Sequence, residues 1–142
     1  MTLFVLDASV AVKWFLLSAE PLKPEAMALL ARRMEGEIEF IVPDLFWAEL
    51  GNILWKATRQ ARCTAPQAEG FLDKAREQDL PTVPSEELLN KALAIAREHN
   101  RSFYDGLYLA LAVTEKIEMI TADERLANAV SSHLPVKWLG YL

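Results

Sequence analysis

The sequence contains very little cysteine, histidine and glycine. Its 142 residues include one cysteine, two histidines and five glycines. The single Cys63 excludes a disulfide framework and a cysteine-cluster metal site. Because the glycines are scattered, no glycine-rich loop that could cradle a phosphate is present, and the Gly-x-Ser-x-Gly pattern of a nucleophile elbow is also missing. A nucleotide-binding loop and a hydrolase of the nucleophile-elbow type are therefore excluded.

The chain also lacks an excess of positive charge and a long hydrophobic run. A net charge of −5 argues against a protein that holds nucleic acid by bulk electrostatics, so a polyanionic substrate would need a metal ion or a small basic patch. The most apolar stretch, residues 103–113, contains Asp105 and is too short to cross a bilayer. The apolar N-terminal segment includes Asp7 and Lys13, unlike a signal peptide. We expect a cytoplasmic protein without a membrane partner.

Apolar residues are abundant in the chain. Hydrophobic residues make up 52% and charged residues 25%, which excludes disorder. A chain of this length buries about two thirds of its unfolded surface, enough for a full hydrophobic core. We therefore expect one domain over residues 1–142.

Short apolar runs alternate with helical patterns along the chain. Strands are expected at residues 3–6, 39–42 and 118–121, with weaker ones at 81–84 and 136–139. Helices are expected at residues 8–17, 24–34, 45–62, 102–116 and 123–130, with one more after a capping box at Thr64–Gln67 and another capped by Ser85. This alternation predicts an α/β fold with three layers, α/β/α, around a short, mostly parallel sheet of four or five strands.

Two aspartates follow predicted strands directly or closely. Asp7 comes after residues 3–6, and Asp123 comes shortly after residues 118–121. In an open parallel sheet, ligands bind in the space beyond the carboxyl ends of the strands. We therefore expect these two side chains to face one crevice, although more than a hundred residues separate them.

Two further carboxylates lie within apolar helical segments. Glu49 and Asn52 are the polar exceptions on one face of a helix that is apolar almost all round, and Asp105 is the only charged residue between 103 and 113. A buried, unpaired carboxylate costs several kcal/mol unless it is neutralised or binds a cation. Oxygen ligands without usable histidine or cysteine favour Mg²⁺ or Mn²⁺. The sequence thus indicates a divalent metal site formed by four acids.

Each acid also has a simpler explanation. The two aspartates after strands could cap the helices that follow them. Asp105 lies three residues after Ser102 and could close a capping box. Glu49 caps nothing, so its simplest partner is a salt bridge to Lys13 or Lys56. One metal ion accounts for all four acids together, and we favour it for that reason.

Four segments of the chain resemble, in order, the PIN-domain ribonucleases and, within them, the VapC toxins of bacterial and archaeal toxin–antitoxin pairs. The segments are VLDASVAVKWF, VPDLFWAELGNILWKA, SFYDGLYLALA and ITADERLANA. The resemblance implies hydrolysis of phosphodiester bonds in single-stranded or loop RNA at an acidic pocket that binds Mg²⁺ or Mn²⁺. Its acids would be Asp7, Glu49, Asp105 and Asp123.

The resemblance assigns supporting positions and partners as well. Ser9 and Thr121 match small hydroxyl positions beside the first and last acids, and Asn52 matches a polar residue one turn after the glutamate. Gly106 stands where the family pattern suggests alanine, and we expect this to affect helix propensity more than chemistry. The resemblance also implies a homodimer and an antitoxin peptide near the acidic site.

Four basic residues are candidates for RNA contacts. They are Lys13, Lys56, Arg59 and Arg62, the last three along one predicted helix. A solvated helix face explains the same pattern, so both interpretations remain open.

Two other α/β families with strand-end aspartates fit less well. A phosphoacceptor receiver domain needs paired early acids and a lysine after a late strand, and a haloacid-dehalogenase phosphatase needs Asp-x-Asp where this chain has Asp7-Ala8-Ser9. The serious alternative is a PIN scaffold with a dormant site that acts as a binding module. Metal-dependent cleavage of RNA would separate the two hypotheses.

Overall fold

The computed structural model describes residues 1–142 and contains five strands, seven α-helices and three short 3-10 helices. The strands are β1 (Thr2–Leu6), β2 (Ile38–Pro43), β3 (Thr82–Val83), β4 (Glu118–Thr121) and β5 (Val136–Trp138). The α-helices are α1 (Ala8–Ala11), α2 (Lys23–Met34), α3 (Leu45–Arg59), α4 (Ala65–Glu77), α5 (Leu89–His99), α6 (Phe103–Glu115) and α7 (Glu124–Val130). The 3-10 helices are η1 (Val12–Trp14), η2 (Ser85–Leu88) and η3 (Leu139–Tyr141). None of the helices combines the length and apolar character that a bilayer crossing requires.

The five strands form one sheet in the order β3-β2-β1-β4-β5, and every neighbouring pair is parallel. β1 is central and short, and Val5 and Leu6 are fully buried in it. A continuous apolar run is typical of a strand covered on both faces. The predicted α/β fold is confirmed, with the larger of the two expected strand numbers.

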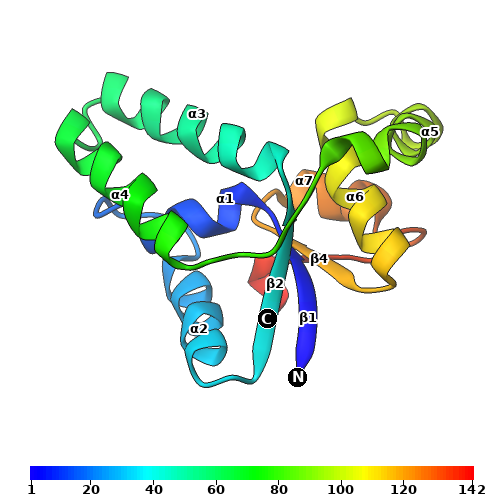
Figure 1. Ribbon diagram of the computed structural model, residues 1–142, viewed down its shortest axis with the longest axis horizontal. Coiled ribbons are helices and arrows are strands. Elements are labelled where there is room, and N and C mark those ends of the chain that lie inside the picture. Colours follow the sequence, from blue (N-terminus) through cyan, green and yellow to red (C-terminus); the bar gives the residue numbers. More distant parts are fainter.

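The helices cover both faces of this sheet (Figure 1). Helices α1 to α4 lie on one side, and α5 to α7 lie on the other, with α6 in contact with β1, β2 and β4. The chain therefore leaves β1 toward one face and β4 toward the opposite face. In such a sheet, the gap beyond the ends of these two neighbouring strands is the topological switch point, where ligands bind.

The core is a single cluster of 38 buried residues, and α6 is the helix most deeply embedded in it. Helix α6 approaches α5 so closely that a Cβ atom on Gly106 would lie 2.5 Å from the carbonyl oxygen of Ala92. Our expectation for Gly106 considered helix propensity and chemistry and left out this packing contact. The glycine matters because it lets two helix backbones meet, and its effect on helix propensity is secondary.

Several predicted elements differ in detail. The helix expected at residues 8–17 is only one turn of α1 followed by η1, and the helix expected at residues 45–62 ends at Arg59. Ser85 does not cap a helix, because it begins η2 and its hydroxyl donates to the Asp44 carboxylate. The capping box of Thr64 and Gln67 is confirmed, as is the short edge strand β3.

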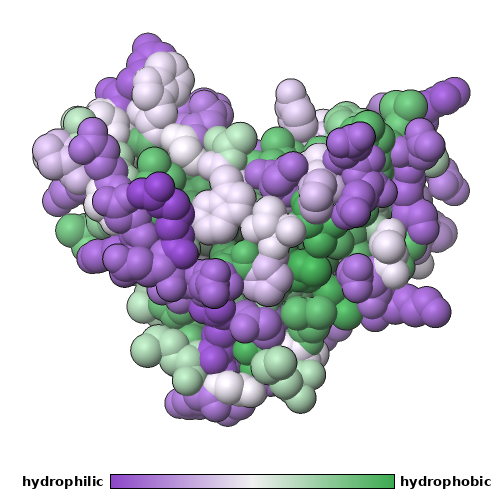
Figure 2. Space-filling view, viewed as in Figure 1, coloured by the Kyte–Doolittle hydropathy of each residue, from purple (hydrophilic) through white to green (hydrophobic).

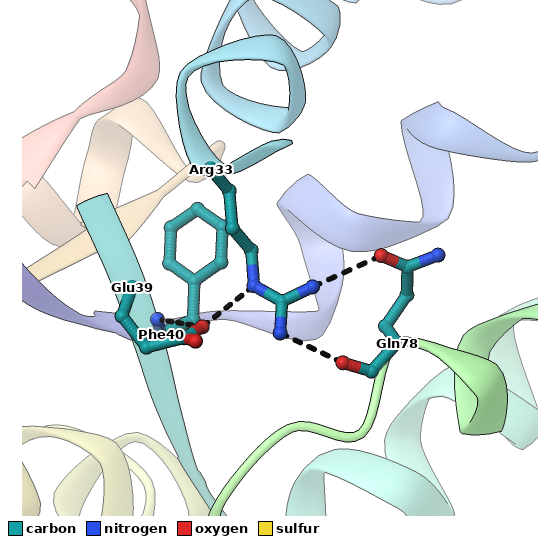
Figure 3. A network of polar contacts seen from close by, with 4 residues as sticks. All are labelled: Arg33, Glu39, Phe40 and Gln78. Atoms are coloured by element: carbon teal, nitrogen blue, oxygen red, sulfur yellow. Dashed lines mark hydrogen bonds and ion pairs between the residues drawn. The ribbon is translucent and has the colours of Figure 1, made fainter. Parts of the chain in front are cut away.

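A polar network ties α2 and the end of α4 to β2 (Figure 3). Arg33 Nε donates to Glu39 Oε1 at 2.6 Å, while its two Nη atoms donate to the side chain and the backbone of Gln78 at 3.0 and 2.7 Å. The backbone N–H of Phe40 donates to the same Glu39 oxygen at 2.8 Å. Burial alone would raise the pKa of Glu39, but these donors and the Arg33 charge outweigh it and lower the pKa.

Candidate active site

Asp7 lies at the carboxyl end of β1, on the switch point. Its Oδ2 accepts a 2.7 Å hydrogen bond from the Thr121 hydroxyl, and its Oδ1 accepts one of 3.3 Å from the Ser9 backbone N–H. Asp7 therefore does cap α1. Burial raises the pKa of Asp7, these hydrogen bonds lower it in part, and the charge of Asp105 raises it again. Asp7 is therefore a helix cap, as the simple explanation states, but it is also a buried carboxylate whose charged form is unfavourable.

The hydroxyls of Ser9 and Thr121 link the end of β4 to the end of β1. The backbone N–H of Ala122 donates to Ser9 Oγ at 3.1 Å, and that of Asp123 donates to Thr121 Oγ1 at 3.0 Å. Asp123 caps α7 by accepting a 3.1 Å bond from the Leu126 N–H, as the simple explanation requires. Its side chain is exposed, so it is not one of the buried acids that we expected.

Glu49 reaches the same place from α3. It is half-buried, and burial raises its pKa, a shift that the nearby Tyr108 hydroxyl counteracts. The charges of Asp7 and Asp105 raise the pKa of Glu49 further. Glu49 thus lies near two other carboxylates.

The helix that carries Glu49 is not buried all round, contrary to our expectation. Asn52 and Trp55 are exposed on α3. The sequence pattern did not reveal the exposed face of α3, because some of the residues on that face are apolar, Trp55 among them. No ion pair joins Glu49 to Lys13 or Lys56, so the alternative explanation of Glu49 as half of a salt bridge is not found.

Asp105 lies in the first turn of α6. Its backbone N–H donates to Ser102 Oγ at 3.0 Å, which caps the helix. Burial raises the pKa of Asp105, while Arg101, whose Nε lies 3.7 Å from Asp105 Oδ2, lowers it, and the charge of Asp123 raises it. Sequence analysis did not identify Arg101, although its i, i+4 spacing to Asp105 was a usable signal.

The structure brings the four acids into electrostatic range of one another. Asp105 influences Asp7, Glu49 is influenced by both, and Asp123 influences Asp105. The side chains stand apart, however. No group of three or more acidic, histidine or cysteine side chains is arranged closely enough to hold a metal ion.

Tyr108 is a second residue that sequence analysis missed. It is only 2% exposed, and its hydroxyl has no hydrogen-bond partner of normal geometry. Burial and the negative charges of Asp7 and Glu49 raise the pKa of Tyr108 above its usual range, so the hydroxyl stays protonated. It lies three residues after Asp105, so the spacing on one helix face was the available signal.

The four basic candidates do not share one surface. Lys13 is 8% exposed in η1, where burial lowers its pKa against the opposing effect of Glu20. Arg62 forms an ion pair with Glu20. Lys56 and Arg59 are exposed on α3. Only these last two extend along the helix that carries Glu49.

The PIN domain family matches residues 4–130, which include all four acids. The chain belongs to the PIN-domain family. Ribonuclease VapC3 of Pyrobaculum aerophilum is 33% identical over 110 residues, which cover 74% of this chain and 82% of the relative. Ribonuclease VapC1 of Mycobacterium tuberculosis is 33% identical over 104 residues, covering 73% and 77% of the two chains. The predicted membership in this family, with its likeness to VapC ribonucleases, is confirmed.

Solved structures show the same PIN-type fold. A crystal structure of a Pyrobaculum aerophilum protein superposes with a TM-score of 0.71 at 21% identity, covering 99% of this chain and 85% of that one. VapBC2 from Rickettsia felis, bound to a DNA fragment from its promoter, gives a TM-score of 0.63 at 13% identity and covers 96% and 98%. A toxin–antitoxin complex from Klebsiella pneumoniae gives 0.64 at 15% identity and covers 94% and 95%.

Proposed function

We propose that this PIN-domain chain is an endoribonuclease that requires Mg²⁺ or Mn²⁺ and acts as the toxin of a toxin–antitoxin pair. The observation that carries the proposal is the convergence of four carboxylates, from four separated segments, at the switch point between β1 and β4. Three of them have raised pKa values. Groups of like charge with perturbed pKa values at a ligand-binding edge are typical of catalytic sites.

The donor set suits a hard divalent cation. Asp7, Glu49, Asp105 and Asp123 offer only carboxylate oxygens, and Arg101 is the one cation paired with any of them. Mg²⁺ and Mn²⁺ prefer such ligands. These four residues would hold the ion, and their side chains would have to approach one another more closely than they stand.

The protein's own groups prepare the site for a phosphodiester. A bound Mg²⁺ or Mn²⁺ would supply charge neutralisation at the phosphate, activation of water and stabilisation of the departing 3′ oxygen. The Thr121 hydroxyl and the Ser9 N–H fix both oxygens of Asp7, so that this carboxylate is oriented in advance. Arg101 places a guanidinium beside Asp105.

The relatives and structural neighbours support the choice of substrate and partners. The curated relatives are named ribonucleases, and structural neighbours include a toxin–antitoxin complex. We propose RNA as the substrate, a cognate antitoxin as the inhibitor, and a homodimer as the assembly. The second candidate, a dormant PIN module, is favoured by the open spacing of the acids.

The test is cleavage of labelled RNA by the purified chain. We expect cleavage in millimolar Mg²⁺ or Mn²⁺ and none in excess EDTA. Undiminished cleavage in EDTA would refute the metal dependence, and RNA binding without cleavage in either metal would establish the dormant module. Light scattering checks the assembly, because a dimer has twice the 16.0 kDa of the chain.

A further inference from the structure

A small hollow lies beside the acidic group, between α3 and the start of α6. Its volume is about 290 Å³, and its lining residues are Leu45, Ala48, Glu49, Asn52 and Tyr104. The outline of the molecule is notched between the side formed by α3 and α4 and the side formed by α5 and α6 (Figures 1 and 2). Because Glu49 belongs both to the lining and to the acids, the hollow is continuous with the proposed catalytic site.

The lining combines an aromatic ring, an amide, the Glu49 carboxylate and two apolar side chains. Tyr104 is 60% exposed, and its ring stacks on no other aromatic ring of the chain. The Asn52 side chain is exposed on the opposite wall, with Leu45 and Ala48 beside it. A nucleobase has the matching chemistry, since its faces stack on aromatic rings and its edges carry hydrogen-bonding groups.

We propose that this hollow binds one unstacked nucleobase of a single-stranded RNA substrate, next to the phosphate that is cleaved. Tyr104 stacks on the base, and the Asn52 amide faces its polar edge. The hollow is slightly smaller than the roughly 300–1,000 Å³ of a site for a drug-sized ligand, which suits one base. This inference rests on the proposed ribonuclease function and adds to it a binding position for one base beside the cleaved bond.

The surface beyond the hollow favours a nucleic acid strand as the occupant. Seven residues of α3 separate Glu49 from Lys56, which is about 10 Å along the helix axis. There Lys56, Arg59 and Trp55 line a second hollow of about 420 Å³, and the Arg59 guanidinium lies 4.9 Å from the centre of the Trp55 ring. Two cations at this distance can hold phosphates of a strand whose base sits against Tyr104, although the chain as a whole is acidic.

The test compares Tyr104→Ala and Tyr104→Phe with Tyr141→Ala, which removes another exposed tyrosine, in η3. Each variant cleaves a short single-stranded RNA and a set of copies in which one nucleotide at a time is abasic. We expect Tyr104→Ala to raise KM about tenfold with little change in kcat, the size of one lost base–aromatic stack. Tyr104→Phe keeps the aromatic ring and should restore most of the lost affinity, whereas Tyr141→Ala should behave as the unmodified chain.

The abasic series separates base stacking from a structural effect. In the unmodified chain, one abasic position beside the cleaved bond should raise KM about tenfold, and in Tyr104→Ala that position should have no further effect. Additive losses, or an unchanged KM in Tyr104→Ala, would overturn the inference while leaving the ribonuclease intact. Unchanged kinetics with altered self-association would assign the hollow to a second copy of the chain. If the unmodified chain neither binds nor cleaves RNA, the proposed function fails first, and the inference with it.

Discussion

Two polar clusters of this chain use the same residue type in opposite ways. Glu39, near the start of β2, is surrounded by donors from Arg33 and Phe40, and its pKa is lowered. At the other end of the strands, Asp7, Glu49 and Asp105 lie within electrostatic range of one another with a single guanidinium nearby, and their pKa values are raised. Both clusters are partly buried, so burial alone does not explain the difference.

Hydrogen-bond donors and counter-charge explain it, because at Glu39 they outweigh burial, whereas at the acidic cluster burial is the largest cause and is not outweighed. A carboxylate whose partners are supplied by the protein contributes to folding, whereas carboxylates without partners repel one another and cost stability until a cation arrives. The Glu39 cluster fastens α2 and the end of α4 to the sheet (Figure 3). In the function that we propose, the acidic cluster is the site that binds a metal ion. Substitutions in the two clusters should therefore have opposite consequences.

The largest effect is expected from removing one charge in each cluster. Asp7→Asn keeps the shape and the helix cap but removes a charged ligand, so RNA cleavage should fall about a thousandfold, which corresponds to several kcal/mol of lost transition-state stabilisation. In EDTA the variant should be as stable as the parent or slightly more stable, because one repelling charge is gone. The measurements are RNA cleavage and thermal melting with and without Mn²⁺.

Glu39→Gln is the matched control, since it makes the same carboxylate-to-amide change outside the site. We expect it to lose about 1–2 kcal/mol of stability and to retain cleavage. Mn²⁺ should raise the melting temperatures of Glu39→Gln and of the parent but not that of Asp7→Asn. At a Mn²⁺ concentration 100 times the dissociation constant, the stabilisation should be about 2.7 kcal/mol. Cleavage and a Mn²⁺ shift in Asp7→Asn would show that Asp7 is only a helix cap.

The next effect concerns how α6 carries Asp105 into the cluster. Gly106→Ala places a methyl group against the Ala92 carbonyl and should cost about 1–3 kcal/mol, even though alanine favours helices. Gly51→Ala, in α3, meets nothing within 4 Å and should stabilise the chain by about 0.5–1 kcal/mol. Denaturant unfolding measures both. A Gly106→Ala chain at least as stable as its parent would show that α5 and α6 can separate at no cost.

Much of this site followed from the sequence, because its acids interrupt patterns that are otherwise regular. Asp7 and Asp123 end strand signals, and Glu49 and Asp105 break apolar helices. Local signals of this kind locate residues along the chain. The alternation of strands and helices likewise placed every strand of the sheet within one or two residues.

What remained hidden depends on packing between distant segments. The ion pair of Arg62 with Glu20 and the close approach of Gly106 to Ala92 join segments that no local pattern relates. The strand order was hidden for the same reason, since the same alternation of elements fits several doubly wound sheets. Tyr108 was missed although it lies three residues after Asp105, because tyrosine in an apolar run is ordinary core material.

A smaller effect is expected from pH, and its sign differs between the clusters. Asp7 holds its proton more tightly in the folded chain than at its ordinary pKa of 3.8, so the metal-free protein should lose stability as the pH rises from there through the raised pKa. Glu39, whose pKa is lowered from 4.5, contributes stability that is lost as the pH falls through its folded value. Urea unfolding in EDTA from about pH 3 to 8 measures both slopes. Asp7→Asn should flatten the loss at higher pH, and Glu39→Gln should flatten the loss at lower pH. If stability depended on pH in the same way in both variants, the two clusters would not differ as we expect.

The smallest effect is expected from the buried tyrosine hydroxyl beside the acidic cluster. Tyr108→Phe removes a buried hydroxyl that has no partner of normal geometry, so stability should change by less than about 1 kcal/mol. That hydroxyl lowers the pKa of Glu49 against the effect of burial, so its loss should raise this pKa further. Cleavage should then need a higher pH to reach the same rate, while the plateau rate stays the same. Tyr104→Phe, which removes an exposed hydroxyl, is the control and should leave the pH profile in place. A stability loss above about 2 kcal/mol in Tyr108→Phe would mean that the hydroxyl is bonded in the folded chain, and the acidic cluster would then hold a structural anchor like that of Glu39.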